Sequence, residues 1–252
     1  YLHGEKQTLR FSNSDEKPFQ MISAAGSKTI ARKGKRTRIW VKEPHGRTRQ
    51  RFTVKTRTSY PDPPADGKTL SIMFKGEGSI IFKQLEVPDH ALLHFGPFGS
   101  FRMDTNRAYY DWIVPQCTDT VHQTLHIADW EAFNVCDTEL HTFFDERCQL
   151  FDVMGGCITG TMQPCDLRAH SEFARAYKSE EVADGRRALL TGSTVVPSDR
   201  QSCIQRVVSS WGSLSHEKFC LGFLDSGIAN DLHGTEDHRL SSEVAKVWVD
   251  TG

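Results

Sequence analysis

Short segments in which apolar and polar residues alternate recur along the chain. This alternation predicts β-strands, because successive side chains of a strand point to opposite faces of a sheet. Two of the segments are separated by Gly76 and Gly78, whose backbone freedom suits the tight turn of a hairpin. We expect strands at residues 8–11, 38–42, 51–55, 69–74, 79–83, 121–127, 204–209 and 244–249.

Three longer segments place apolar residues at rough helical spacing. Residues 19–32, 132–150 and 167–183 are therefore predicted to form helices. The prolines and the Asp-Gly pair of residues 61–67 predict a loop. Helices interleaved with strands favour a layered α/β sandwich formed by residues 1–252 as a single domain, and an all-β sandwich or jelly roll is the alternative.

Composition narrows the class of protein. The chain has 252 residues, of which 38% are hydrophobic and 25% are charged, and its net charge is −1. These values favour a folded protein with a sizeable core, and the apolar runs are too short to span a bilayer. The seven cysteines contain no Cys-x-x-Cys pair, so zinc-ribbon spacing is absent. Reduced thiols and partial disulfide pairing both remain open.

Charge is unevenly distributed along the sequence. Residues 28–57 contain twelve Lys or Arg and one acid, whereas acidic residues predominate over residues 129–152. Basic residues with nearby aromatic residues suit a phosphate backbone with stacked bases, although two solvated faces would have the same pattern. The residues predicted to bind an anionic polymer such as nucleic acid are Arg36, Arg38, Lys42, Arg47, Arg49 and Arg51.

Five polar residues at predicted strand ends form a candidate catalytic set, because strand ends can meet at one edge of a sheet. Glu43, supported by Asn13, is predicted to bind Mg²⁺, which prefers oxygen ligands. His126 and His238 are predicted catalytic residues that stabilise a phosphate or a leaving oxygen, with Asp237 orienting His238.

The order of these segments resembles that of the deoxyribonuclease I-like endonuclease/exonuclease/phosphatase superfamily. Residues 9–13 resemble its first strand with an Asn, residues 39–43 its strand ending in a metal-binding Glu, and residues 237–238 its terminal Asp-His motif. This resemblance implies a four-layered α/β sandwich that hydrolyses phosphate esters. Cys157 and Thr159 stand where the family has Asp and Asn, which implies an altered or inactive relative.

From these observations we predict a metal-dependent phosphodiesterase or nuclease-like hydrolase that acts on a phosphate ester such as nucleic acid. One alternative is a non-catalytic β-rich module that binds an anionic polymer through residues 28–57. Another is a secreted lyase or hydrolase that acts on an acidic polysaccharide. Mg²⁺-dependent turnover separates the first function from the second.

Overall fold

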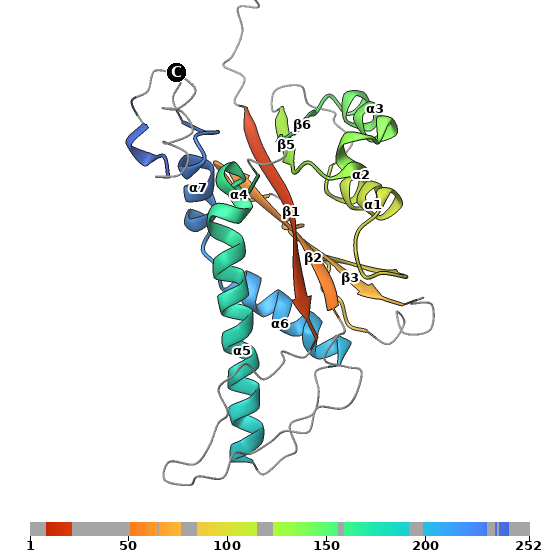
Figure 1. Cartoon of the computed structure of the whole chain (residues 1–252), viewed down its shortest axis with the longest axis vertical. Helices are drawn as coiled ribbons and strands as arrows, with labels where there is room; N and C mark the ends of the chain where they lie inside the picture. The colour runs from red at the N-terminus through yellow and green to blue at the C-terminus, as the bar shows by residue number, and fades with distance from the viewer. Residues whose placement is uncertain are drawn as a thin grey trace, which may run out of the picture.

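One mixed sheet forms the centre of the molecule (Figure 1). In this computed structural model, the described residues form six strands in the order β4-β3-β2-β1-β5-β6. The structure describes residues 9–21, 51–64, 66–76, 85–114, 123–155, 159–191, 199–230, 235 and 237–241.

The first strand in the sequence lies in the middle of the sheet and pairs with β2 and β5. The pairs β1–β2 and β2–β3 are antiparallel, whereas β1–β5, β5–β6 and β3–β4 are parallel. A tight hairpin cannot join parallel strands, and two helices, α2 and α3, lie between β5 and β6 in the sequence. The strands are β1 (Arg10–Gln20), β2 (Arg51–Tyr60), β3 (Leu70–Lys75), β4 (Ala91–Gly96), β5 (Thr124–Ala128) and β6 (Leu150–Val153).

Helices cover both faces of the sheet, with α5, α6 and α7 on one side and α1, α2 and α3 on the other (Figure 1). A π-helical turn, η2, leads directly into α5. The helical elements are α1 (Met103–Ile113), α2 (Ala132–Val135), α3 (Thr138–Glu146), α4 (Thr159–Met162), η2 (Cys165–Ala169), α5 (His170–Leu190), α6 (Arg200–Gly212), α7 (His216–Asp225) and η3 (Asp237–Arg239).

Each face of the sheet has its own apolar core. On one face, side chains such as Phe52 and Ile72 pack against Phe173 of α5 and Val207 of α6. On the other face, α1 and α3 form a second cluster of residues that includes Tyr110 and Phe144. Two helical layers on a sheet confirm the predicted α/β class, and the alternative of an all-β sandwich is wrong.

The predicted strands at residues 51–55, 69–74 and 121–127 are confirmed by β2, β3 and β5, and the helix at 167–183 is confirmed by α5. The strand predicted at 204–209 is wrong, because Cys203, Val207 and Trp211 recur every four residues and form the buried side of α6. Residues 19 and 20 end β1 rather than begin a helix. The strands predicted at 38–42 and 244–249 lie outside the described residues.

Two further predictions concern chemistry and membranes. The described cysteines at positions 136, 148, 165, 203 and 220 are all free thiols, so these five form no disulfide with one another. None of the helices in the described part of the chain combines the length and apolar character that crossing a bilayer requires.

Candidate active site

Three carboxylates approach one region of the sheet from separate parts of the chain. Asn13 of β1 lies opposite Ile127 of the parallel strand β5. Asp15 lies two residues beyond this pair on β1. Asp129 lies two residues beyond it directly after the end of β5, where the charge of Asp15 acts on it. Asp15 is 7% exposed, so a charged group interrupts the buried surface of the central strand.

The third carboxylate comes from the π-helical turn η2. His170 N–H donates to the carbonyl of Cys165, five residues earlier, which defines the π turn. Nδ1 of His170 lies 3.1 Å from Oδ2 of Asp15 and 3.2 Å from Oδ1 of Asp166. The imidazole therefore bridges the two acids, and its Nε2 lies 3.0 Å from the hydroxyl of Thr56 on β2. Single π turns inside helices occur frequently at functional sites.

Asn13 connects the three backbone segments that carry these acids. Its side-chain amide donates to the carbonyl of Ile127 at 3.0 Å, and its side-chain oxygen accepts from the N–H of Cys165 at 2.9 Å. Asn13 is itself two residues from Asp15 and is completely buried. The predicted metal ligand Asn13 thus has both ends of its amide engaged in protein hydrogen bonds, and its place is structural support for the site.

The local electrostatics give the acids different properties. Burial, together with the negative charge of Asp15, raises the pKa of Asp129 to about 7. The hydrogen bond from His170 lowers the pKa of Asp166 despite partial burial. Burial alone would lower the pKa of His170, but its hydrogen bonds with Asp15 and Asp166 outweigh burial and raise it. Acids whose pKa values are separated in this way are typical of catalytic sites.

The donor set fits a divalent cation. Ligand atoms of Asp15, Asp166 and His170 all lie within 4.8 Å of one another. Carboxylate oxygens are the ligands that Mg²⁺ prefers, and Mn²⁺ also accepts imidazole nitrogen. The side chain of Asp166 is 35% exposed, so this group of residues is open to solvent on one side.

The predicted catalytic residue His126 faces the other side of the sheet. It is 3% exposed and packs against Phe144 of α3, with ring centroids 5.1 Å apart. Burial lowers its pKa to about 3, and the charge of Arg57 acts in the same direction. Its strand partner Ser12 and the neighbouring Ser14, which contacts Tyr109 of α1, mark this face as the one opposite Asp15. The structure therefore does not bring His126 to the three acids.

The remaining predicted residues are divided between the described and the undescribed parts of the chain. Asp237 and His238 lie in η3, where His238 is exposed, and the strand expected after them lies outside the described residues. Arg51 is exposed at the start of β2. The predictions for Glu43, Arg36, Arg38, Lys42, Arg47 and Arg49 also fall outside the described residues and stay predictions.

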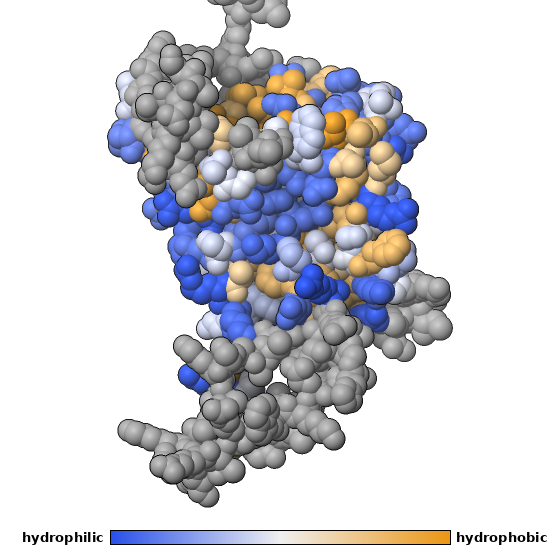
Figure 2. Space-filling view, viewed as in Figure 1, coloured by the Kyte–Doolittle hydropathy of each residue, from blue (hydrophilic) through white to orange (hydrophobic). Residues whose placement is uncertain are grey.

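Sequence reasoning missed Asp15, Asp129 and Asp166. The signal in the sequence was the run of polar residues Ser12–Lys17 between apolar Phe11 and Phe19. Such a run is typical of a turn, but in the structure it is part of strand β1. Hydrophilic residues predominate over the central part of the face shown in Figure 2. A polar run inside a central strand is a marker of a site, because buried polar groups need a specific reason to be there.

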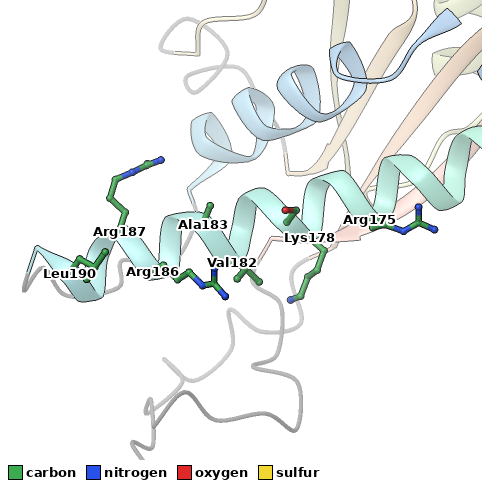
Figure 3. Close-up of a pocket in the computed structure, with 8 residues that line it drawn as sticks. Arg175, Lys178, Val182, Ala183, Arg186, Arg187 and Leu190 are labelled. Atoms are coloured by element: carbon green, nitrogen blue, oxygen red, sulfur yellow. The ribbon is translucent and has the colours of Figure 1, made fainter. Parts of the chain in front are cut away.

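A shallow open groove follows one side of α5 beyond the acids (Figure 3). The side chains recur every three or four residues from Arg175 to Leu190, which places them along one helix face. The described lining includes four basic residues and no acid, with apolar residues between them. These basic residues are Arg175, Lys178, Arg186 and Arg187.

Comparison with known proteins places the fold. No family model matches the sequence, and no curated protein matches it. The crystal structure of the Mos1 strand transfer complex matches with a TM-score of 0.50 at 7% sequence identity, over 94% of this chain and 54% of the other. The Mos1 transposase paired-end complex with left transposon end matches with a TM-score of 0.47 at 7% identity, over 94% and 55%.

This chain therefore spans about half the length of the two chains that it resembles. The comparisons do not specifically confirm the expected relationship to the deoxyribonuclease I-like superfamily. At 7% identity the likeness concerns the fold alone. The described part of the chain therefore shares an α/β fold with the strand transfer complex that it resembles.

Proposed function

We propose that this protein is a divalent-metal-dependent phosphoryl-transfer enzyme that acts on the phosphodiester bonds of nucleic acid. The observation that carries the proposal is the meeting of Asp15 of β1 and Asp166 of η2, with Asp129, directly after β5, close enough for the charge of Asp15 to act on it. The likeness in fold to a strand transfer complex supports nucleic acid as the substrate class.

Asp15 and Asp166 are the residues that would hold the cation, Mg²⁺ or Mn²⁺, with His170 adjacent to both. When bound, such a cation supplies positive charge that offsets the charge of a phosphate and favours attack by an oxygen nucleophile. His170 orients the two carboxylates through Nδ1, and the hydroxyl of Thr56 fixes the other side of its ring.

Asp129 has a different part in the chemistry. Its raised pKa, about 7, allows its carboxyl group to accept or release a proton near neutral pH. The low pKa of Asp166 keeps that carboxylate negative over the same range, which favours cation binding. One acid is thus suited to proton transfer and another to holding charge.

The groove on α5 is proposed as a contact for the nucleic-acid backbone. Its basic side chains begin nine residues after Asp166 on the same continuous helical segment. At 1.5 Å per residue, Arg175 lies about 13 Å along the axis from Asp166, within reach of one bound duplex. The described residues that line the groove include basic side chains and no acid, and this charge is complementary to the phosphates of nucleic acid.

The test is cleavage of supercoiled plasmid and of an end-labelled DNA duplex in Mg²⁺ or Mn²⁺. We expect Asp166→Asn to reduce the cleavage rate at least about 1,000-fold, because an amide cannot replace the carboxylate charge on which transition-state stabilisation depends. The matched control is Asp145→Asn, which changes an exposed acid on α3 away from the site. Circular dichroism should show both variants folded.

Cleavage that persists in Asp166→Asn, or that continues in excess chelator, would contradict the proposal. Binding of DNA with no cleavage in either metal would favour the alternative of a non-catalytic polyanion-binding protein. Direct titration of the protein with Mn²⁺ alone adds an independent check, since Asp166→Asn should weaken that binding and Asp145→Asn should not.

A further inference from the structure

A lysine is buried on the face of the sheet opposite Asp15. Lys55 of β2 is 1% exposed, and its Nζ donates to Oδ1 of Asn106 at 2.7 Å and to Oε1 of Glu16 at 3.1 Å. Removing a charged amine from water is costly unless hydrogen bonds and an opposite charge compensate. A position that retains such a group in place of an apolar residue is a candidate for a functional role.

Aromatic rings enclose the amine. Its nitrogen lies 5.3 Å from the ring centroids of Tyr109, Tyr110 and Phe133, and 5.7 Å from that of Phe101. The faces of aromatic rings attract cations, most strongly where water is excluded. The rings therefore hold the nitrogen in one place and limit its hydrogen bonds to protein partners.

A chain of hydrogen bonds leads from this amine to the acid after β5. The amide of Asn106 donates to Oδ1 of Asn134 at 3.1 Å. The amide of Asn134 in turn donates to Asp129, at 2.9 Å to Oδ1 and at 3.2 Å to the backbone carbonyl. Both asparagines are completely buried.

The lysine fixes the direction of the chain at one end, and the oxygens of Asp129, which accept from Asn134, fix it at the other. Its ammonium group only donates, so the oxygen of Asn106 must face Lys55 and the NH₂ group must face Asn134. Asn134 must then turn its oxygen to Asn106, which leaves its NH₂ group for Asp129. Without the lysine, Asn106 could rotate its amide by half a turn and turn its oxygen to the oxygen of Asn134. Asn134 would then lose that bond or turn its own oxygen toward Asp129.

We propose that Lys55, Asn106 and Asn134 are positioning residues that fix the carboxylate of Asp129 for the reaction. The inference rests on the proposed function, because it takes Asp129 as a member of the active site. None of the three touches substrate in this proposal. They act only by keeping an N–H donor, rather than an oxygen, against Oδ1 of Asp129.

Two substitutions test the direction of the chain in different ways. Lys55→Met removes the donor but keeps an unbranched side chain inside the ring of aromatic residues. Asn106→Asp keeps an acceptor for Lys55, so the amine remains paired and the fold is preserved. Its carboxylate cannot donate to Asn134, so the oxygen of Asn134 either faces another oxygen or turns toward Asp129, and both changes disturb the bond to Asp129. Lys68→Met is the matched control, since Lys68 also bonds a carbonyl of α1 and lies 5.3 Å from the ring of Trp112.

The first measurement is calorimetric titration with Mn²⁺ alone. We expect Lys55→Met, Asn106→Asp and Lys68→Met all to bind Mn²⁺ within about threefold of the wild type, because Asp129 is not among the residues that would hold the cation. The second measurement is cleavage of labelled DNA. We expect Lys55→Met and Asn106→Asp to have a kcat at least about tenfold below that of the wild type and a KM within twofold of it, because the DNA contacts are unchanged. Side-chain NMR signals of Asn134 should shift in both variants and not in the control.

An unchanged kcat in the folded Asn106→Asp variant would overturn the inference, even if Lys55→Met failed to fold. If the wild type binds Mn²⁺ and cleaves DNA and the variants do so equally well, only the positioning role is refuted. A wild-type protein that does neither refutes the proposed function and the inference with it. These outcomes separate the two failures.

Discussion

The two halves of the β1–β2 pair, on the side of the sheet covered by α5, are built from opposite kinds of residue. At one end Phe19 pairs with Phe52, and both pack into the apolar core. From the middle of the pair toward the other end the residues are polar: Asp15 pairs with Thr56, two residues from completely buried Asn13. Both ends are inaccessible to water to a similar degree, but only the first follows the usual rule for a protein interior.

This contrast indicates which half was shaped by stability and which by chemistry. Apolar side chains stabilise the fold wherever they pack, without directional requirements. Buried polar side chains need a partner for each donor and acceptor, and they contribute less net stability. The half around Asp15 satisfies this need with bonds to β5 and η2, and it is the half in which we propose that the reaction takes place.

The largest expected effect is in the apolar half. Phe52→Ala should lower the free energy of unfolding by about 3–5 kcal/mol, because the side chain is fully buried and its removal leaves a cavity. Phe98→Ala, at a side chain that is 74% exposed, should change it by less than about 0.5 kcal/mol. Urea unfolding measures both. Equal effects for the two would show that burial in this half does not stabilise the fold.

Compared with Phe52→Ala, Asn13→Ala is expected to reduce the free energy of unfolding less and the rate of DNA cleavage more. The substitution leaves the carbonyl of Ile127 and the N–H of Cys165 without their partner, which should cost about 2–3 kcal/mol. Thr142→Ala, which removes a hydroxyl bond on the surface of α3, is the control. DNA cleavage by Asn13→Ala that remains at the wild-type level, after correction for the folded fraction, would contradict the role of Asn13 in aligning the acids.

The core on the other face of the sheet should respond to pH. Burial lowers the pKa of His126 to about 3, so its imidazole stays neutral in the folded protein. The unfolded chain gains a proton below pH about 6.5, and stability is lost as pH falls from there by up to about 1.4 kcal/mol per unit. Urea unfolding at pH 7 and pH 5 should show a smaller decrease in His126→Leu than in the wild type. The same decrease in both would mean that His126 does not contribute.

The smallest effect is expected at the groove on α5. Arg186→Glu should weaken binding to a DNA duplex by a few-fold at low salt, and should reduce the salt dependence of binding by about one unit of slope. Lys75→Glu, an exposed substitution at the end of β3, is the control for net charge. Fluorescence anisotropy in a series of salt concentrations measures the slope. Identical slopes for the two variants would remove the groove from the proposed contact surface.

The sequence allowed a correct prediction of the α/β class and of the elements in which apolar periodicity is regular. It failed at α6, because the adjacent Val207 and Val208 with Ile204 resemble a strand until Trp211 extends the helical spacing. The site could not be predicted because β1 remains extended through polar residues that local rules assign to a turn. Asp166 lies 151 residues from Asp15, and only the tertiary fold brings the two together.

The π-helical turn before α5 has a consequence for how the site and the core can change independently. A π turn contains one residue more than the α-helical turn that would replace it, as the bond from His170 to Cys165 shows. Deleting a single residue there would leave Phe173 and Tyr177 in phase with the sheet but would rotate Asp166 by about 100° around the helix axis. The one extra residue of the π turn thus sets the direction of the Asp166 side chain independently of the way in which α5 packs on the sheet.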